Sequence, residues 1–107
     1  MNTSSILIEK CKELAKKNEA LANEFRVLIL VILVKLGETS WSKLKNELEN
    51  ILRTSINPNL LAFHLRKLVN MGFVKRIETE SETLYKPTIP DEYKHLIVQV
   101  LKASEAK

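Results

Sequence analysis

The sequence predicts a mainly α-helical protein with one small β-hairpin, and three observations indicate this class. The chain has 107 residues, 45% of them hydrophobic, which is enough to bury a single core. It contains only two glycines and three prolines, as is typical of helical chains. Its apolar residues recur mostly at helical spacing, and only FVKRIE and TLYKPT, which flank the tetrad TESE, indicate strands. We therefore expect one domain over residues 1–107.

Residues 20–36 are predicted to form the central helix of the core. From Val27 onward this segment is apolar on nearly every side, and such a helix must be buried on every side. Gly37 ends it, because glycine readily adopts the backbone conformation that stops a helix. Four further helices, all amphipathic, are expected over residues 5–17, 41–52, 57–72 and 91–104.

Capping residues mark the ends of the two helices that follow the central one. Thr39 or Ser40 is expected to cap the helix over residues 41–52. Asn57 caps the next helix, and Pro58 occupies a first-turn position where a missing N–H costs nothing. Gly72 ends that helix, and the hairpin follows directly.

This order of elements is that of a winged helix-turn-helix. Two short helices joined by a tight connection allow the second to place its outer face in the major groove of DNA. The hairpin that follows can reach the adjacent backbone or the minor groove. We expect residues 20–88 to form the winged-helix core, and residues 1–19 and 91–107 to form additional N- and C-terminal helices.

The predicted recognition helix, residues 57–72, has an outward face suited to base edges. Its aliphatic residues form one narrow stripe, whereas Phe63 lies on the opposite side among amides and cations. Amides and cations hydrogen-bond base edges, and an apolar group can contact thymine methyls. Phe63 could instead be an isolated surface residue or touch the wing. The residues expected to read bases are Asn59, Leu60, Phe63 and Arg66.

The positive charge of the chain is concentrated near this helix. Of a formal net charge of +4, residues 41–72 contribute +3, from five basic and two acidic residues. Glu78, Glu80 and Glu82 would repel phosphate, so the base of the wing and not its tip is expected to touch DNA. The alternative for the helix cations is an ordinary solvated face, and the alternative for His64 is a packing role. The expected backbone contacts are Lys43, Lys45, Arg53, Asn57, His64, Lys67, Lys75, Arg76 and Lys86.

The first and last helices carry more apolar surface than the winged-helix core is expected to cover. They either pack only on their own core or pack against a second chain, and we expect a homodimer. A twofold dimer would hold two recognition helices roughly 34 Å apart and bind an inverted repeat. The expected interface residues are Ile6, Leu7, Leu14, Tyr93, Leu96, Ile97, Val100 and Leu101.

Two motifs carry a resemblance to a known family. LANEFRVLIL at residues 21–30 fits the core-helix pattern L-A-x-x-x-R-x-x-I-L, and LAFHLRKLVNMGFV at 61–74 fits L-S-x-H-L-x-x-L-x-x-x-G-[LF]-V, with Ala62 replacing the usual serine. On these motifs the chain resembles the ArsR-like and MarR-like winged-helix transcription regulators, particularly small archaeal ones, over roughly residues 20–88. The resemblance implies a regulator that binds double-stranded DNA and dimerises through its terminal helices. Because so small a domain lacks an activation surface, we expect a repressor that acts by occlusion.

No catalytic, cofactor or metal motif is found in the sequence, so we expect no enzyme, no cofactor and no small-molecule effector. Asp91 and His95 lie four residues apart but lack a second His or Cys nearby. Cys11 is the single cysteine, which excludes an internal disulfide and fits a reducing compartment.

The longest apolar run, residues 27–34, is far shorter than the roughly 20 residues of a membrane span. Without a secretory signal, the chain is expected to be cytoplasmic and not membrane-bound.

A second hypothesis is a winged-helix module that binds another protein within the transcription machinery, with Phe63 as its anchor. This hypothesis predicts weak DNA binding without sequence preference. RNA binding is less well supported, because the basic segments lack the interleaved aromatic residues that stack single-stranded bases.

Overall fold

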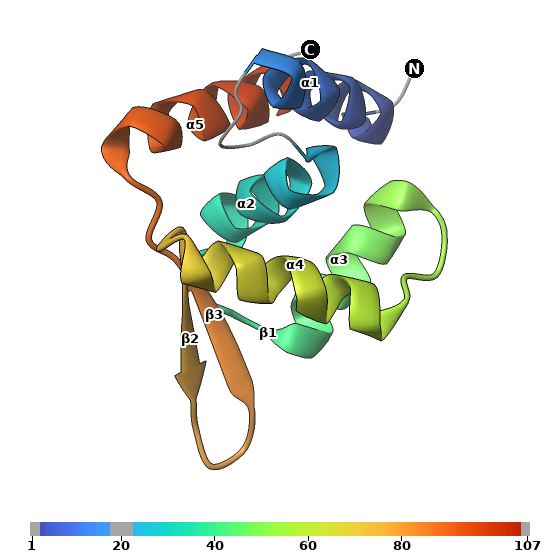
Figure 1. Cartoon of the computed structure of the whole chain (residues 1–107). Helices are drawn as coiled ribbons and strands as arrows, with labels where there is room; N and C mark the ends of the chain where they lie inside the picture. The colour runs from blue at the N-terminus through green and yellow to red at the C-terminus, as the bar shows by residue number, and fades with distance from the viewer. Residues whose placement is uncertain (1–2, 18–22, 106–107) are drawn as a thin grey trace.

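A computed structural model describes the backbone of residues 3–17 and 23–105, and the side chains of residues 5–12 and 23–104. Within these residues the chain forms five helices and three short strands (Figure 1). The predicted class, mainly α with a small β element, is confirmed. In chain order the elements are α1 Thr3–Lys17, α2 Glu24–Leu36, β1 Thr39–Ser40, α3 Trp41–Leu52, α4 Pro58–Asn70, β2 Val74–Glu78, β3 Thr83–Pro87 and α5 Asp91–Glu105.

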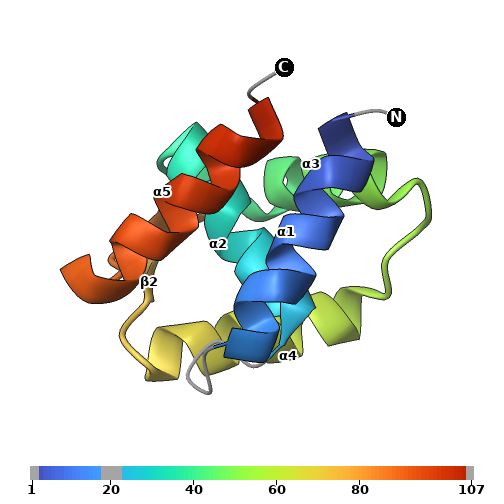
Figure 2. The ribbon, with the colours of Figure 1, turned by 90° about the horizontal axis from the view of Figure 1, so that it is seen from above.

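Helix α2 is the centre of the core, as its apolar circumference predicts. Its residues from Val27 to Leu33 are all buried. Helices α1 and α5 lie side by side on one side of α2, and α3 and α4 cover the other side (Figures 1 and 2). The helix begins at Glu24 because the side chain of Asn23 caps it, accepting a hydrogen bond from Arg26 N at 3.1 Å. Asn23, which the prediction placed inside the helix, is extended and precedes it, and residues 20–22 lie outside the described residues.

The sheet has three strands in the order β1-β3-β2, so it contains the predicted hairpin and one strand that was not predicted. Strands β2 and β3 pair antiparallel as expected, and Thr39 and Ser40 add a two-residue strand opposite Tyr85 and Leu84. Two residues are too few for an alternating pattern, and their partners lie more than forty positions along the chain. This extra strand ties the start of α3 to the wing, because Ser40 also caps α3 by accepting a hydrogen bond from Lys43 N at 3.1 Å.

Helix α4 is held at both ends by the residues that the sequence marks. The Asn57 side chain accepts a hydrogen bond from Asn59 N at 2.8 Å, and Pro58 is the first helical residue. At the other end Gly72 has φ of 82°. The N–H of Gly72 donates a hydrogen bond to Val69 O, and the N–H of Phe73 donates one to Leu68 O at 2.9 Å. These two bonds are those of a Schellman motif, which explains why a glycine stands at this position.

The terminal helices pack on α2 and on each other within one chain, which corrects part of the predicted dimer interface. Leu7, Ile97 and Val100 are buried in this core, so they are unavailable to a second copy. Ile97, for example, has no exposed surface. The side chain of Leu14 lies outside the described residues. The interface residues that remain partly exposed are Ile6, Tyr93, Leu96 and Leu101.

Candidate nucleic-acid interface

The face of α4 that points away from α2 and α3 is polar except for Leu60 and Phe63. Leu61, Leu65 and Leu68 are buried on the inner face. Phe63 is 47% exposed, which confirms that it points outward. The other exposed residues of the outer face are Asn59, Leu60, Arg66, Lys67 and Asn70. Their contact with DNA stays a prediction.

The exposed ring of Phe63 is fixed by two neighbours on the same helix. The imidazole of His64 meets its edge, with ring centroids 5.3 Å apart and nearly perpendicular planes. Lys67 Nζ lies 5.4 Å from the centroid of the Phe63 ring. An exposed cation–π contact of this kind contributes about 0.5–1 kcal/mol. Phe63 therefore presents a preorganised apolar surface, which lowers the entropy lost when it is covered.

His64 is largely buried, which weakens its prediction as a backbone contact. The residue is buried, and its ring centroid lies 5.1 Å from that of Phe25 on α2. Burial lowers the pKa of His64, and the positive charge of Arg26 lowers it further, so the imidazole is neutral at pH 7. Its role is the alternative one, packing α4 against α2, because the ring lies between the phenyl groups of Phe25 and Phe63.

Arg26 is a residue of this region that the sequence analysis placed only in the core motif. Its Nη1 lies 3.9 Å from Met71 Sδ at the end of α4. Arg26 Nε and His64 Nδ1 are both buried, and neither has a hydrogen-bond partner in the described part of the chain. A buried unpaired polar atom costs about 1–3 kcal/mol. An arginine directly before the apolar run at residues 27–34 was the signal that could have drawn attention to this residue.

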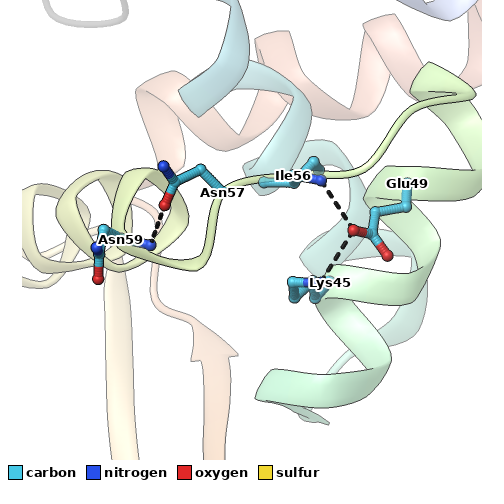
Figure 3. A network of polar contacts seen from close by, with 5 residues as sticks. All are labelled: Lys45, Glu49, Ile56, Asn57 and Asn59. Carbon is cyan, nitrogen blue, oxygen red and sulfur yellow. Dashed lines mark hydrogen bonds and ion pairs between the residues drawn. The ribbon is translucent and has the colours of Figure 1, made fainter.

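The connection between α3 and α4 is organised by the carboxylate of Glu49 (Figure 3). Glu49 Oε2 accepts hydrogen bonds from Ile56 N at 2.8 Å and from Lys45 Nζ at 2.9 Å. Both hydrogen bonds lower the pKa of Glu49, and the one from the Ile56 backbone has the larger effect. Lys45 therefore already has an anionic partner, which weakens its prediction as a phosphate contact. Lys43 is exposed on the same helix, with no ion pair in the described residues.

Arg53 turns the chain out of α3 in an unfavourable backbone conformation. It has φ of 58° and ψ of 39°, the left-handed region, and within the described residues it is the one non-glycine residue with positive φ. A single residue held in such a region costs about 1–3 kcal/mol, and such residues concentrate at functional sites. The exposed guanidinium of Arg53 is thereby placed at the corner between the two helices of the helix-turn-helix.

The wing divides its three basic residues between two faces. Arg76 is the cross-strand neighbour of Tyr85, and both lie on the face of the hairpin that packs toward α3 and α4. Lys75 and Lys86 are exposed cross-strand partners on the opposite face. Like charges directly opposite each other destabilise a hairpin. The lysine pair therefore lowers the stability of the hairpin, but it favours the binding of an anionic partner. The acidic tip lies beyond them, starting at Glu78.

A hollow of about 260 Å³ separates α4 from the wing. Arg66 reaches it from α4 and Arg76 from β2, and Tyr85 forms part of its wall. Ala62, Leu65 and Val69 supply the apolar lining. Two guanidinium groups on either side of one hollow provide several donors for an anionic oxygen. The structure thus brings together two residues that the sequence assigned to different roles.

Two solved structures have the same fold. They are complexes designated hsRosR-S1 and hsRosR-S4, of RosR, a haloarchaeal transcription regulator of the winged-helix type. The first is 25% identical, with a TM-score of 0.63, over 82% of this chain and 73% of that chain. The second is 24% identical, with a TM-score of 0.63, over 86% of this chain and 75% of that chain.

This chain has the winged-helix fold. The prediction of a winged helix-turn-helix with additional terminal helices is therefore confirmed. No protein-family model matches the chain, and no curated protein matches it. The narrower resemblance to ArsR-like and MarR-like regulators stays a prediction.

The described residues offer few other sites. They contain no group of three or more His, Cys, Asp or Glu side chains that could hold a metal ion. Cys11 is buried, and burial raises its pKa to about 12, so its thiol is protonated and poorly nucleophilic. None of the helices described is both long and apolar enough to cross a membrane.

The buried His64 predicts that stability falls in mild acid. Its pKa is lower in the folded chain than its ordinary value of 6.5, so the unfolded chain binds a proton more readily. The free energy of unfolding should be highest above pH 6.5 and fall as the pH drops toward the lowered pKa. Urea denaturation between about pH 5 and 8 measures this slope. His64→Gln should flatten it, whereas His95→Gln, in the exposed histidine, should not; equal slopes in all three proteins would contradict the assignment.

The lysine pair on the wing predicts that its removal stabilises the fold. Lys86→Gln should raise the free energy of unfolding by about 0.2–1 kcal/mol, because it removes the repulsion by Lys75. Lys86→Glu should raise it further. Denaturation at low salt is the appropriate measurement, since salt screens surface charges. In a Lys75→Gln background the gain from Lys86→Gln should disappear, and a gain that persists there would show that the two lysines do not interact.

Proposed function

We propose that this chain is a transcriptional regulator that binds specific double-stranded DNA sequences. The observation that carries the proposal is the outer face of α4, where Asn59, Phe63 and Arg66 are exposed together beside a wing with a basic base. Such a face offers amide, cationic and apolar groups to base edges. The likeness to RosR, a transcription regulator, supports the same role.

In this proposal α4 reads sequence and the surrounding cations supply affinity that depends on salt. Asn59, Leu60, Phe63 and Arg66 read bases. His64 is left out because it is buried, and Lys45 is a secondary contact because Glu49 already binds it. The remaining backbone contacts are Lys43, Arg53, Asn57, Lys67, Lys75, Arg76 and Lys86, all of them exposed.

We further propose a homodimer that represses by occupying its site. The α1–α5 layer lies on the opposite side of α2 from α4, so a second copy could pack there without covering the recognition face (Figure 1). Ile6, Tyr93, Leu96 and Leu101 retain partial exposure for this contact. The site would then be an inverted repeat. No cofactor or small-molecule effector is part of the proposal.

Two observations favour a second candidate function, a module that binds another protein. In the part of the chain that the structure describes, the exposed large apolar side chains are Leu60, Phe63 and Met71, and all three lie on α4 or at its end. Apolar and aromatic anchors are typical of protein interfaces. In addition, residues 74–87 of the wing carry three basic and three acidic residues, a net charge of zero.

Selection of bound duplexes from a random DNA pool near physiological salt distinguishes the two functions. A regulator should enrich an inverted repeat whose half-sites lie about one helical turn apart. Retention of DNA without enrichment, lost as salt rises, would contradict sequence-specific recognition by this chain and favour the protein-binding module. Light scattering on the same sample measures whether the chain is a dimer.

Arg66 provides a separate test of how α4 contacts DNA. If Arg66 reads a base, Arg66→Ala should weaken binding to the selected site by about 1–3 kcal/mol and relax the preference at one position. Titration of duplexes substituted at each position measures this. A uniform loss across all sequences would reassign Arg66 to a phosphate. The matched control Lys94→Ala, in an exposed residue of α5, should leave binding unchanged.

A further inference from the structure

The most strongly constrained cation of the wing is Arg76, because it already has an anionic partner. Arg76 Nη2 lies 2.8 Å from Glu78 Oε1. The two residues are two positions apart on β2, so both side chains emerge on the same face of the hairpin, the face of Tyr85. Both are more than half exposed, so DNA can reach the pair from solvent.

Arg76 also lies at the junction of two hollows. One is the hollow between α4 and the wing, shared with Arg66. The other, of about 380 Å³, lies beside the start of α3 and is lined by Ser40, Ser42 and Glu82 as well as Arg76. A phosphate in either hollow would approach the same guanidinium. In either hollow it would compete with Glu78 for Arg76, and in the second hollow it would also meet the carboxylate of Glu82.

We propose that Glu78 is a determinant of DNA affinity, holding Arg76 as an internal counter-ion that a DNA phosphate must displace. The inference rests on the proposed DNA-binding function and adds a specific residue to it. In the free chain the carboxylate takes the position on Arg76 that a phosphate oxygen takes in the complex. Binding at this point exchanges one anion for another, and it leaves the Glu78 carboxylate unpaired beside the DNA.

This exchange has a consequence for salt dependence. A cation that neutralises a DNA phosphate releases condensed counter-ions, and each such phosphate contributes about 0.9 to the slope of log affinity against log salt. When Arg76 leaves Glu78, the freed carboxylate attracts a cation in its turn. The Arg76–Glu78 pair therefore contributes little to affinity or to the slope, although Arg76 alone would contribute to both.

The test is the binding of a mixed-sequence duplex over a series of KCl concentrations, measured by fluorescence anisotropy. Glu78→Gln should bind about two- to fivefold more tightly than the parent chain, the size expected for one exposed ion pair. Its salt slope should be steeper by up to about 0.9. Glu80→Gln is the matched control, since it removes an acid at the wing tip for which the described residues show no ion pair. It should give a smaller gain.

A double-mutant cycle separates exchange on Arg76 from general repulsion by the acidic tip. In an Arg76→Gln background, Glu78→Gln should improve binding only as much as Glu80→Gln does. An equal gain from Glu78→Gln with and without Arg76 would overturn the proposal, as would equal gains from the two single glutamate variants. Thermal unfolding checks that each variant is folded.

Failure of the proposed sequence-specific regulation gives a different result from failure of the proposed role of Glu78. If the parent chain binds the mixed-sequence duplex but selects no site from a random pool, sequence-specific regulation fails while the role of Glu78 can still hold. If neither the parent chain nor any variant binds duplex DNA at low salt, both proposals are overturned together.

Discussion

The burial of α2 on every side is the constraint on which the rest of the structure depends. The seven residues from Val27 to Leu33 are all buried, and full burial of a large aliphatic side chain contributes about 1.5–3 kcal/mol. Together they outweigh any surface ion pair, which contributes at most about 1 kcal/mol. One layer of helices cannot cover such a helix, so α1 and α5 lie on one side and α3 and α4 on the other. Helix α4, the proposed recognition helix, is therefore first of all a part of the wall around α2.

That arrangement leaves two surfaces pointing in opposite directions, and each has a different character. The α1–α5 surface is stabilised by its own packing, since Leu7 and Ile97 complete the core of a single chain. The surface of α4 and the wing instead contains several local features that lower the stability of the fold. These are the opposed lysines Lys75 and Lys86, the left-handed Arg53 and the unpaired buried atom of His64. Natural proteins tolerate such departures mainly at functional sites, which is why this surface carries the functional proposal.

Electrostatics on this surface is balanced at short range. Glu49 binds Lys45 and, by accepting a hydrogen bond from Ile56 N, fixes the connection that positions α4, while Glu78 binds Arg76 on the wing. Both cations were expected to contact DNA, and both meet a carboxylate first. The cations without such a partner among the described contacts include Arg66 on α4. In the proposed DNA-binding function, this distribution of charge assigns the main electrostatic role to α4 and a modulating role to the wing.

The sequence by itself determined the helices and most of their ends. The apolar circumference of α2, the Asn57 cap and the glycine at position 72 are local signals, and each depends on a few neighbouring residues. The outward position of Phe63 also follows from helical periodicity alone. Only the tertiary structure decided that His64 is buried, that Thr39 and Ser40 join the sheet, and that Val100 packs within its own chain. In each of these cases the deciding neighbour comes from a distant part of the chain: Phe25 for His64, Tyr85 and Leu84 for the added strand, and α2 for the terminal helices. A periodic pattern gives the direction in which a side chain points from its own helix. Whether that side chain is buried depends on the residues that another element packs against it.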